Sequence, residues 1–435
     1  MTNPALINIV GGGLAGAEAA WQAQRQGVRV CLFEMKPERF SPAHQSPLLG
    51  ELVCSNSLRS EAPDSAIGLL KNELRRLGSL IMGAAAASRV PAGKALAVDR
   101  QAFARFITEA LAEQPDVEIV RQEVTALNFS EPAVIATGPL TTDSMAESLR
   151  ELTGREQLHF YDAISPIVFA DSINHDIVFR ASRYGAGDDY LNCPLTEADY
   201  QTFYQALTTA ELMPLRTFEE ARFFEGCLPI EVMAARGYQT LLFGPMKPVG
   251  LMDPHTGRQP FAVVQLRQEN REGELYNLVG FQTRLKYGEQ RRVLRLLPGL
   301  EQAEFARLGS VHRNTFIHSP GLLTRFLNFA ARPQLFLGGQ ITGVEGYLES
   351  TAMGWLAGVN AARLARQQPL LSPPPETAMG ALVRHITNTE VRDFQPMNVN
   401  FGLFPALPGR VPKKGRGAAY AQRALEALEA WLARL

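Results

Sequence analysis

The first forty residues change hydrophobic pattern twice. Residues 7–10 form a short β-branched run, residues 17–25 continue with helix-like composition, and residues 28–33 form a second apolar run that ends on Glu34. A strand-like run, a helical segment and a second strand-like run are the pattern of a β-α-β unit. We therefore expect an α/β fold in which parallel strands are joined by helices.

The turn between the first strand and the helix carries Gly11, Gly13 and Gly16 in the spacing G-x-G-x-x-G. The first glycine permits the tight turn, the second lets the backbone approach a pyrophosphate, and the third packs helix on strand. Free N–H groups at the helix start would hold phosphate oxygens, and Glu34 would bind the ribose. The alternative is a glycine turn without a ligand. The strand, the helix and the acidic residue all stand where the motif requires them, which favours a dinucleotide ligand. The motif's position at the start of the chain favours FAD over NAD. The predicted contacts are Gly11, Gly12, Gly13, Leu14, Ala15, Gly16, Glu34 and Met35.

Later segments repeat the strand and glycine-turn pattern. Residues 133–140 (AVIATGPL) read as a buried strand that ends in a Thr-Gly turn, and residues 334–347 as a strand and glycine turn before a helix from about residue 350 to 365. Helices are also expected over 69–87 and after Asp99, which is a good capping residue. Residues 41–68 are expected to form a long functional loop. The further predicted cofactor contacts are Thr137, Gly138, Gly339, Gln340, Glu345 and Gly346.

The pattern changes near residue 160, where segments rich in aromatic and β-branched residues are divided by Gly and Pro. We expect a Rossmann-type FAD-binding domain with an inserted, smaller α+β domain. The predicted division is 1–160 and 306–435 for the FAD-binding domain, the second part with C-terminal helices, and 161–305 for an insert that binds the substrate. A chain of 435 residues is too long for one core, which agrees with this division.

Composition narrows the class of protein. Hydrophobic residues make up 46% of the chain and charged residues 20%, with a net charge of −1, as in an ordinary globular enzyme. No apolar run reaches the roughly 18 residues of a membrane span. The first residues lack a basic targeting region, so we expect a cytoplasmic protein without a membrane partner. The four cysteines have neither disulfide nor metal-site spacing, so no metal is predicted.

Basic residues gather in three stretches, over 284–295, 304–345 and 404–423. Two explanations remain open from charge alone: a polyanionic partner bound along one face, or ordinary solvated surface charges.

The cysteines fall into two groups. Cys31 alternates within a strand and Cys193 precedes a helix, so both are expected to be structural. Cys54 and Cys227 stand in irregular segments, and Arg59 follows Cys54 closely, so each is a candidate for a reactive thiolate. From these residues alone, structural roles for the second pair stay open as well.

Several longer motifs carry a family resemblance: GGGLAGAEAAW, LFEMKP, ELVCSNSLRS, VIATGPLTTDSM, FEGCLP, FGPMKPVGL, HRNTFI and GGQITGVEGYLES. From residue 7 to about 430 the chain resembles the bacterial folate- and FAD-dependent tRNA (uracil-5-)-methyltransferases, within the broader GidA-type tRNA-modifying flavoproteins. Arg284 in GFQTRLK departs from this pattern, in which His is expected.

The resemblance implies methylation of tRNA at C5 of the T-loop uridine at position 54. The carbon would come from 5,10-methylenetetrahydrofolate, and FAD would be reduced by NADPH or NADH. It implies catalytic roles for Cys54 and Cys227, with Cys227 as nucleophile at C6 and Cys54 as base, in an order that stays open. No protein partner is implied.

The resemblance also suggests substrate contacts. The folate candidates are His312, Tyr347 and Lys286. The tRNA candidates are Arg284, Arg313, Arg410, Lys413, Lys414 and Arg416. A structural histidine and a packing tyrosine remain alternatives for the first two. Other functions also stay open: a GidA-like flavoprotein oxidoreductase acting on another tRNA position or a small molecule, and a non-catalytic tRNA-binding flavoprotein.

Overall fold

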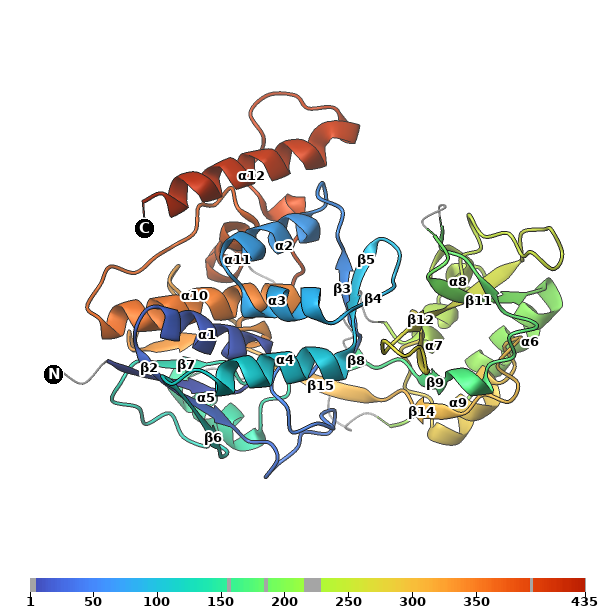
Figure 1. Ribbon diagram of the computed structural model, residues 1–435, viewed down its shortest axis with the longest axis horizontal. Helices are drawn as coiled ribbons and strands as arrows, with labels where there is room; N and C mark the ends of the chain where they lie inside the picture. Colours follow the sequence, from blue (N-terminus) through green and yellow to red (C-terminus); the bar gives the residue numbers. More distant parts are fainter. Residues whose placement is uncertain (1–4, 155–157, 184–186, 215–227, 392–393, 435) are drawn as a thin grey trace.

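A five-stranded parallel sheet forms the centre of the larger part of the molecule (Figure 1). The computed structural model describes residues 5–154, 158–183, 187–214, 228–391 and 394–434. The strand order is β16-β7-β1-β2-β6. The strands are β1 (Leu6–Val10), β2 (Arg29–Glu34), β6 (Val117–Arg121), β7 (Ala133–Ile135) and β16 (Leu335–Leu337). The predicted α/β class and the first β-α-β unit are confirmed.

The helices of this larger part are α1 (Leu14–Arg25), α2 (Ala66–Arg76), α3 (Leu80–Ala87), α4 (Arg100–Ala112), α5 (Asp143–Thr153), α10 (Tyr347–Ala365), α11 (Ala378–Thr387) and α12 (Arg416–Leu432). Helices α1, α4 and α10 contact the five-stranded sheet, and further helices pack outside them. Asp99 caps α4 as expected, because its carboxylate accepts a hydrogen bond from the Ala102 N–H at 2.9 Å.

Three boundaries differ from the sequence predictions. The helix expected over 69–87 is two helices, because Gly78 takes a positive φ of 68° between them. The loop expected over 41–68 contains β3 (Ser57–Ser60), which pairs with β5 (Ala95–Val98) and, through it, with β4 (Arg89–Val90). Helix α10 begins at Tyr347, three residues before the expected start.

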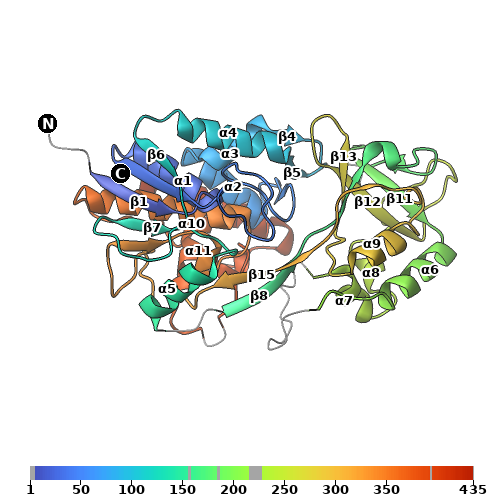
Figure 2. The same cartoon turned by 90° about the horizontal axis from the view of Figure 1, so that it is seen from below.

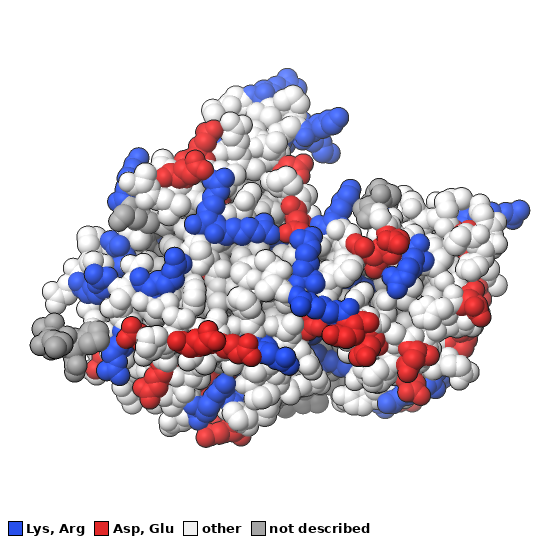
Figure 3. Space-filling view, viewed as in Figure 1, with Lys and Arg blue, Asp and Glu red and all other residues white. Residues whose placement is uncertain are grey.

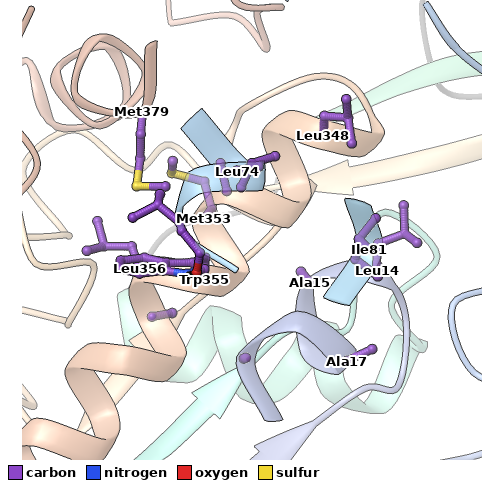
Figure 4. Packing of buried hydrophobic residues seen from close by; sticks show 14 of the residues in the cluster. Leu14, Ala15, Ala17, Leu74, Ile81, Leu348, Met353, Trp355, Leu356 and Met379 are labelled. Carbon is purple, nitrogen blue, oxygen red and sulfur yellow. Dashed lines mark hydrogen bonds between the residues drawn. The ribbon is translucent and has the colours of Figure 1, made fainter. Parts of the chain in front are cut away.

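Close contact between α1 and α10 organises the main core. A Cβ on Gly354 would lie 2.2 Å from the backbone oxygen of Ala15, so only glycine permits this approach. Met353, Trp355 and Leu356 of α10 pack with apolar residues of neighbouring helices (Figure 4). This packing fixes the amino-terminal ends of α1 and α10, both of which border the cavity described below.

A six-stranded antiparallel sheet forms the smaller part of the molecule, in the order β10-β11-β12-β13-β9-β14. Its strands are β9 (Ile167–Phe169), β10 (Phe179–Arg180), β11 (Tyr190–Leu195), β12 (Ala262–Gln268), β13 (Leu275–Leu278) and β14 (Phe305–Arg307). Its helices are α6 (Glu197–Thr208), α7 (Ile230–Ala235), α8 (Thr240–Phe243) and α9 (Tyr287–Leu294). This part has a core of its own.

A two-stranded antiparallel ribbon joins the two parts, as Figure 2 shows. It pairs β8 (Leu158–Ala163) with β15 (Val311–Phe316), and Asp162 is the direct partner of His312. The predicted insert boundaries at residues 161 and 305 fall in or next to this ribbon. Among the described helices, none has both the length and the apolar character needed to cross a membrane.

Candidate active site

A cavity of about 380 Å³ lies at the carboxyl ends of β1, β2 and β7. Ligands of open α/β sheets bind at this edge. Most of the residues predicted to contact a cofactor line it: Gly11, Gly12, Gly13, Leu14, Ala15, Glu34, Met35, Thr137, Gly138, Gly339, Gln340, Glu345 and Gly346. Gly16 lies beneath the turn, where a Cβ would come within 1.7 Å of the Gly11 oxygen.

The cavity fits a dinucleotide on its own geometry. Gly13 is the N-cap residue of α1 and Gly346 is that of α10, and neither helix has a side-chain cap. Their first N–H groups therefore remain available to anionic oxygens. A Cβ built on Gly13 would meet nothing within 4 Å, which leaves space for a ligand beside the turn. Glu34 is buried and accepts a hydrogen bond from the Gly12 N–H at 2.8 Å.

The segment that carries Cys54 is held from several sides. The Tyr347 hydroxyl accepts hydrogen bonds from the backbone N–H groups of Cys54 at 2.9 Å and Ser55 at 3.1 Å. Arg100 donates to the carbonyl oxygens of Leu52 and Cys54. Because Arg100 also pairs with Glu269 of the smaller part at 2.7 Å, both parts of the molecule position this segment.

Two polar groups lie close to the Cys54 sulfur. Sγ lies 3.4 Å from Oδ2 of Asp162 and 3.8 Å from Nε2 of His312. These donor atoms all lie within 4.8 Å of one another. Burial lowers the pKa of His312, against the opposing effect of Asp162, so the imidazole is held in its neutral form.

The environment of Cys54 corrects the expectation of a thiolate stabilised by Arg59. Burial raises the pKa of the Cys54 thiol well above its usual value, and the charge of Asp162 raises it further. The Arg59 guanidinium forms an ion pair with Glu349 instead. Cys54 is therefore a protonated thiol in this structure. Cys227, the other candidate, lies outside the described residues.

Glu345 borders the same part of the cavity. Burial raises the pKa of its carboxyl well above the usual value, and Asp162 adds to the effect. Gln340 donates a hydrogen bond to Oε2 at 2.5 Å. A neutral carboxyl next to a protonated thiol gives this wall two groups that can release protons.

The other two described cysteines, Cys31 and Cys193, do not line the cavity. Cys193 is fully buried in β11, in agreement with a structural role. Cys31 is only half-buried, since its strand neighbours Val30 and Leu32 occupy the core face, which corrects the expectation of a core thiol.

The predicted substrate residues occupy four places. His312 and Tyr347 line the cavity. Arg284 and Arg313 line a neighbouring hollow of about 460 Å³, into which His312 also extends. Lys286 lines neither, and its ammonium pairs with Glu211 at 2.5 Å. Arg410, Lys413, Lys414 and Arg416 are exposed before and at the start of α12, where Figure 3 shows Lys and Arg on the surface.

Among the residues of the cavity wall that sequence reasoning missed are Asp162 and Asn314. Both are buried polar residues of the paired strands β8 and β15. The available signal for Asp162 was a single acidic residue in the segment LHFYDA, whereas Asn314 lies in the polar segment VHRNTF, which offered none.

Fold and cavity together define a Rossmann-type protein of the FAD-binding kind with a second, antiparallel part. The model of the family "Glucose inhibited division protein A" (GIDA) matches residues 6–369. The chain therefore belongs to the GIDA family, in the group whose members below are named TrmFO.

Two relatives in this group are similar over nearly their whole length. A protein of Geobacter sulfurreducens named methylenetetrahydrofolate–tRNA-(uracil-5-)-methyltransferase TrmFO is 61% identical over 429 residues, covering 98% of this chain and 99% of its own. A protein of the same name from Desulfotalea psychrophila is 58% identical over 434 residues, covering 99% and 98%. The structure of Aquifex aeolicus GidA superimposes with a TM-score of 0.70 at 15% identity, covering 98% of this chain and 74% of that one. This structural match confirms the fold.

Proposed function

We propose that this chain is a folate-dependent tRNA methyltransferase that methylates C5 of the T-loop uridine at position 54. The carbon donor is 5,10-methylenetetrahydrofolate, the bound cofactor is FAD, and NADPH or NADH supplies the electrons. The observation that carries the proposal is the position of the Cys54 thiol in the cavity that the glycine turns line, in a chain 61% identical to a protein of that name.

Different residues of the cavity would bind different parts of FAD. The N–H groups at the start of α1 would hold the pyrophosphate of FAD, Glu34 would bind its ribose, and the residues from Gly339 to Gly346 would contact the remainder of the cofactor. When bound, FAD supplies the reducing equivalents that turn a transferred methylene into a methyl group.

The two cysteines supply the nucleophile and the base that methylation of uracil needs. C5 of uracil is a poor nucleophile until a thiolate adds to C6, and the C5 proton must later be removed. Cys227 is assigned to the first step and Cys54 to the second. Since Cys54 is protonated in this structure, it must first release its own proton, and Asp162 is the carboxylate that its thiol contacts.

The tRNA backbone is assigned to the exposed basic residues before and at the start of α12. None of Arg410, Lys413, Lys414 and Arg416 forms an ion pair within the described residues, so their charges are available to phosphates. The target base is then read inside the cavity after it leaves the stack.

The test is a comparison of carbon donors. Purified flavin-containing protein is incubated with unmodified tRNA transcript, NADPH and methylenetetrahydrofolate labelled in its one-carbon unit. We expect label in 5-methyluridine. Label transferred only from S-adenosylmethionine, or none from either donor, rejects the proposal.

A further inference from the structure

We propose that the side-chain amide of Asn314 binds the ring N–H and adjacent carbonyl of the flat heterocycle that undergoes or feeds the reaction. This inference rests on the proposed function and deepens it. The ligand must present a lactam edge, which is a ring N–H next to a C=O group. Both the target uracil and the pterin of the carbon donor have such an edge.

The position of Asn314 follows from the ribbon that joins the two parts of the molecule. His312 and Asn314 are two residues apart on β15, so their side chains lie on the same face of the strand. Asp162 is the direct partner of His312 on β8. These three residues, here called the polar row, all line the cavity.

The polar row has hydrogen-bonding capacity that the protein does not use. Asn314 is 1% exposed, and its Oδ1 has no hydrogen-bond partner among the described residues. His312 is 6% exposed, and its Nδ1 has none either. Buried polar side chains are almost always hydrogen-bonded, so two unpartnered atoms on one wall indicate a ligand.

The chemistry of an amide selects the ligand class. A carboxamide presents one acceptor and two donors side by side, whichever way it is oriented. It therefore forms paired hydrogen bonds with an edge that offers both an N–H and a carbonyl, as asparagine does with base edges. A phosphate or carboxylate would use only its donor side and leave Oδ1 unpartnered.

The test removes the proposed hydrogen bond in two ways: from the ligand, by N3-methylation, and from the protein, by substitution of Asn314. Binding to the flavin-containing protein is measured by titration for a T-arm RNA stem-loop with uridine or 3-methyluridine at the target, and for tetrahydrofolate or its N3-methylated analogue. Each ligand is titrated against the wild type, Asn314→Ala and the matched control Asn72→Ala. Asn72 lies on α2 and does not line the cavity. Asn314→Ser replaces Asn314→Ala if the latter fails to fold.

We expect N3-methylation to weaken wild-type binding of one of the two ligands about tenfold or more, and this penalty to disappear in the Asn314 variant but not in Asn72→Ala. Loss of the penalty for the RNA assigns the amide to uracil, and loss for the folate assigns it to pterin.

If N3-methylation weakened the binding of each ligand by the same factor in all three proteins, the inference would be overturned. A change confined to flavin content or the flavin spectrum would overturn it too, because the amide would then serve the isoalloxazine ring. Binding is measured without turnover, so failure of the proposed methyl transfer in the wild type is seen separately.

Discussion

The thiol of Cys54 lies 3.4 Å from Oδ2 of Asp162, although the two residues are 108 positions apart in the sequence. The contact forms because the ribbon of β8 and β15 brings Asp162 to the segment that Tyr347 and Arg100 hold in place. A carboxylate at this distance favours the neutral thiol. Burial is the larger cause of the raised pKa of the Cys54 thiol, and this contact adds to it.

Asp162→Asn should make the Cys54 thiol more acidic. The substitution keeps the shape of the side chain but removes the charge that raises the pKa of Cys54. We expect alkylation of Cys54 by iodoacetamide at pH 8 to become several-fold faster, as followed by peptide mass spectrometry. Asp171→Asn, an exposed carboxylate next to β9, is the matched control and should leave the rate unchanged. An equal or slower rate in Asp162→Asn contradicts the electrostatic account.

Tyr347→Phe should loosen the Cys54 segment. The hydroxyl accepts two backbone hydrogen bonds, and its loss leaves two N–H groups without a partner. We expect the free energy of unfolding to fall by about 1–3 kcal/mol and kcat to fall more than KM rises. Urea denaturation and steady-state kinetics measure the two effects. Tyr420→Phe is the control, because the Tyr420 ring stacks on Phe401 and its hydroxyl makes no hydrogen bond within the described residues. An equal loss in both variants would show that the hydroxyl has no special role.

Local patterns were sufficient for the cofactor side of the cavity. The glycine turn at Gly11–Gly16 and the acid Glu34 belong to one continuous β-α-β unit, so their spacing along the chain determines their spacing in space. The α/β class and the family resemblance were confirmed for the same reason.

The substrate side of the cavity could not be predicted in this way. Asp162 and Asn314 come to the same cavity wall only through the antiparallel pairing of β8 and β15, which no local pattern specifies. The protonation of Cys54 also depends on this pairing, whereas its sequence neighbour Arg59 suggested the opposite. The Cys227 role and the insert boundaries remain predictions.

His44→Gln should make the protein less sensitive to acid. Burial, with the nearby charge of Lys36, lowers the pKa of His44 from 6.5 to about 4. Between these values the unfolded chain binds a proton that the folded chain does not, so stability falls as the pH drops from about 6.5 to about 4. We expect His44→Gln to remove up to about 3 kcal/mol of this loss, as measured by urea denaturation across the pH range. In the exposed control His255→Gln the acid slope should match that of the wild type. A wild-type slope in His44→Gln as well would contradict the prediction.

Replacement of Lys413 and Lys414 by Ala should weaken tRNA binding in a salt-dependent manner. Both side chains are exposed next to the start of α12. The slope of log Kd against log salt should fall by about 1 for each lysine–phosphate interaction that the substitutions remove. Filter binding at several salt concentrations measures this slope. Arg29→Ala, exposed at the opposite end of β2 from the cavity, is the control. If the slope of the double variant equals that of the control, tRNA does not contact these lysines.

The central claim is that the thiol in the cavity takes part in methylation of the tRNA uridine. The most direct measurement is a single-turnover reaction of wild-type and Cys54→Ala protein, both with bound flavin, using labelled methylenetetrahydrofolate and unmodified tRNA. The account predicts label at uridine 54 with the wild type and at least a hundredfold slower labelling with Cys54→Ala at equal flavin content. Labelling by Cys54→Ala at the wild-type rate would contradict it.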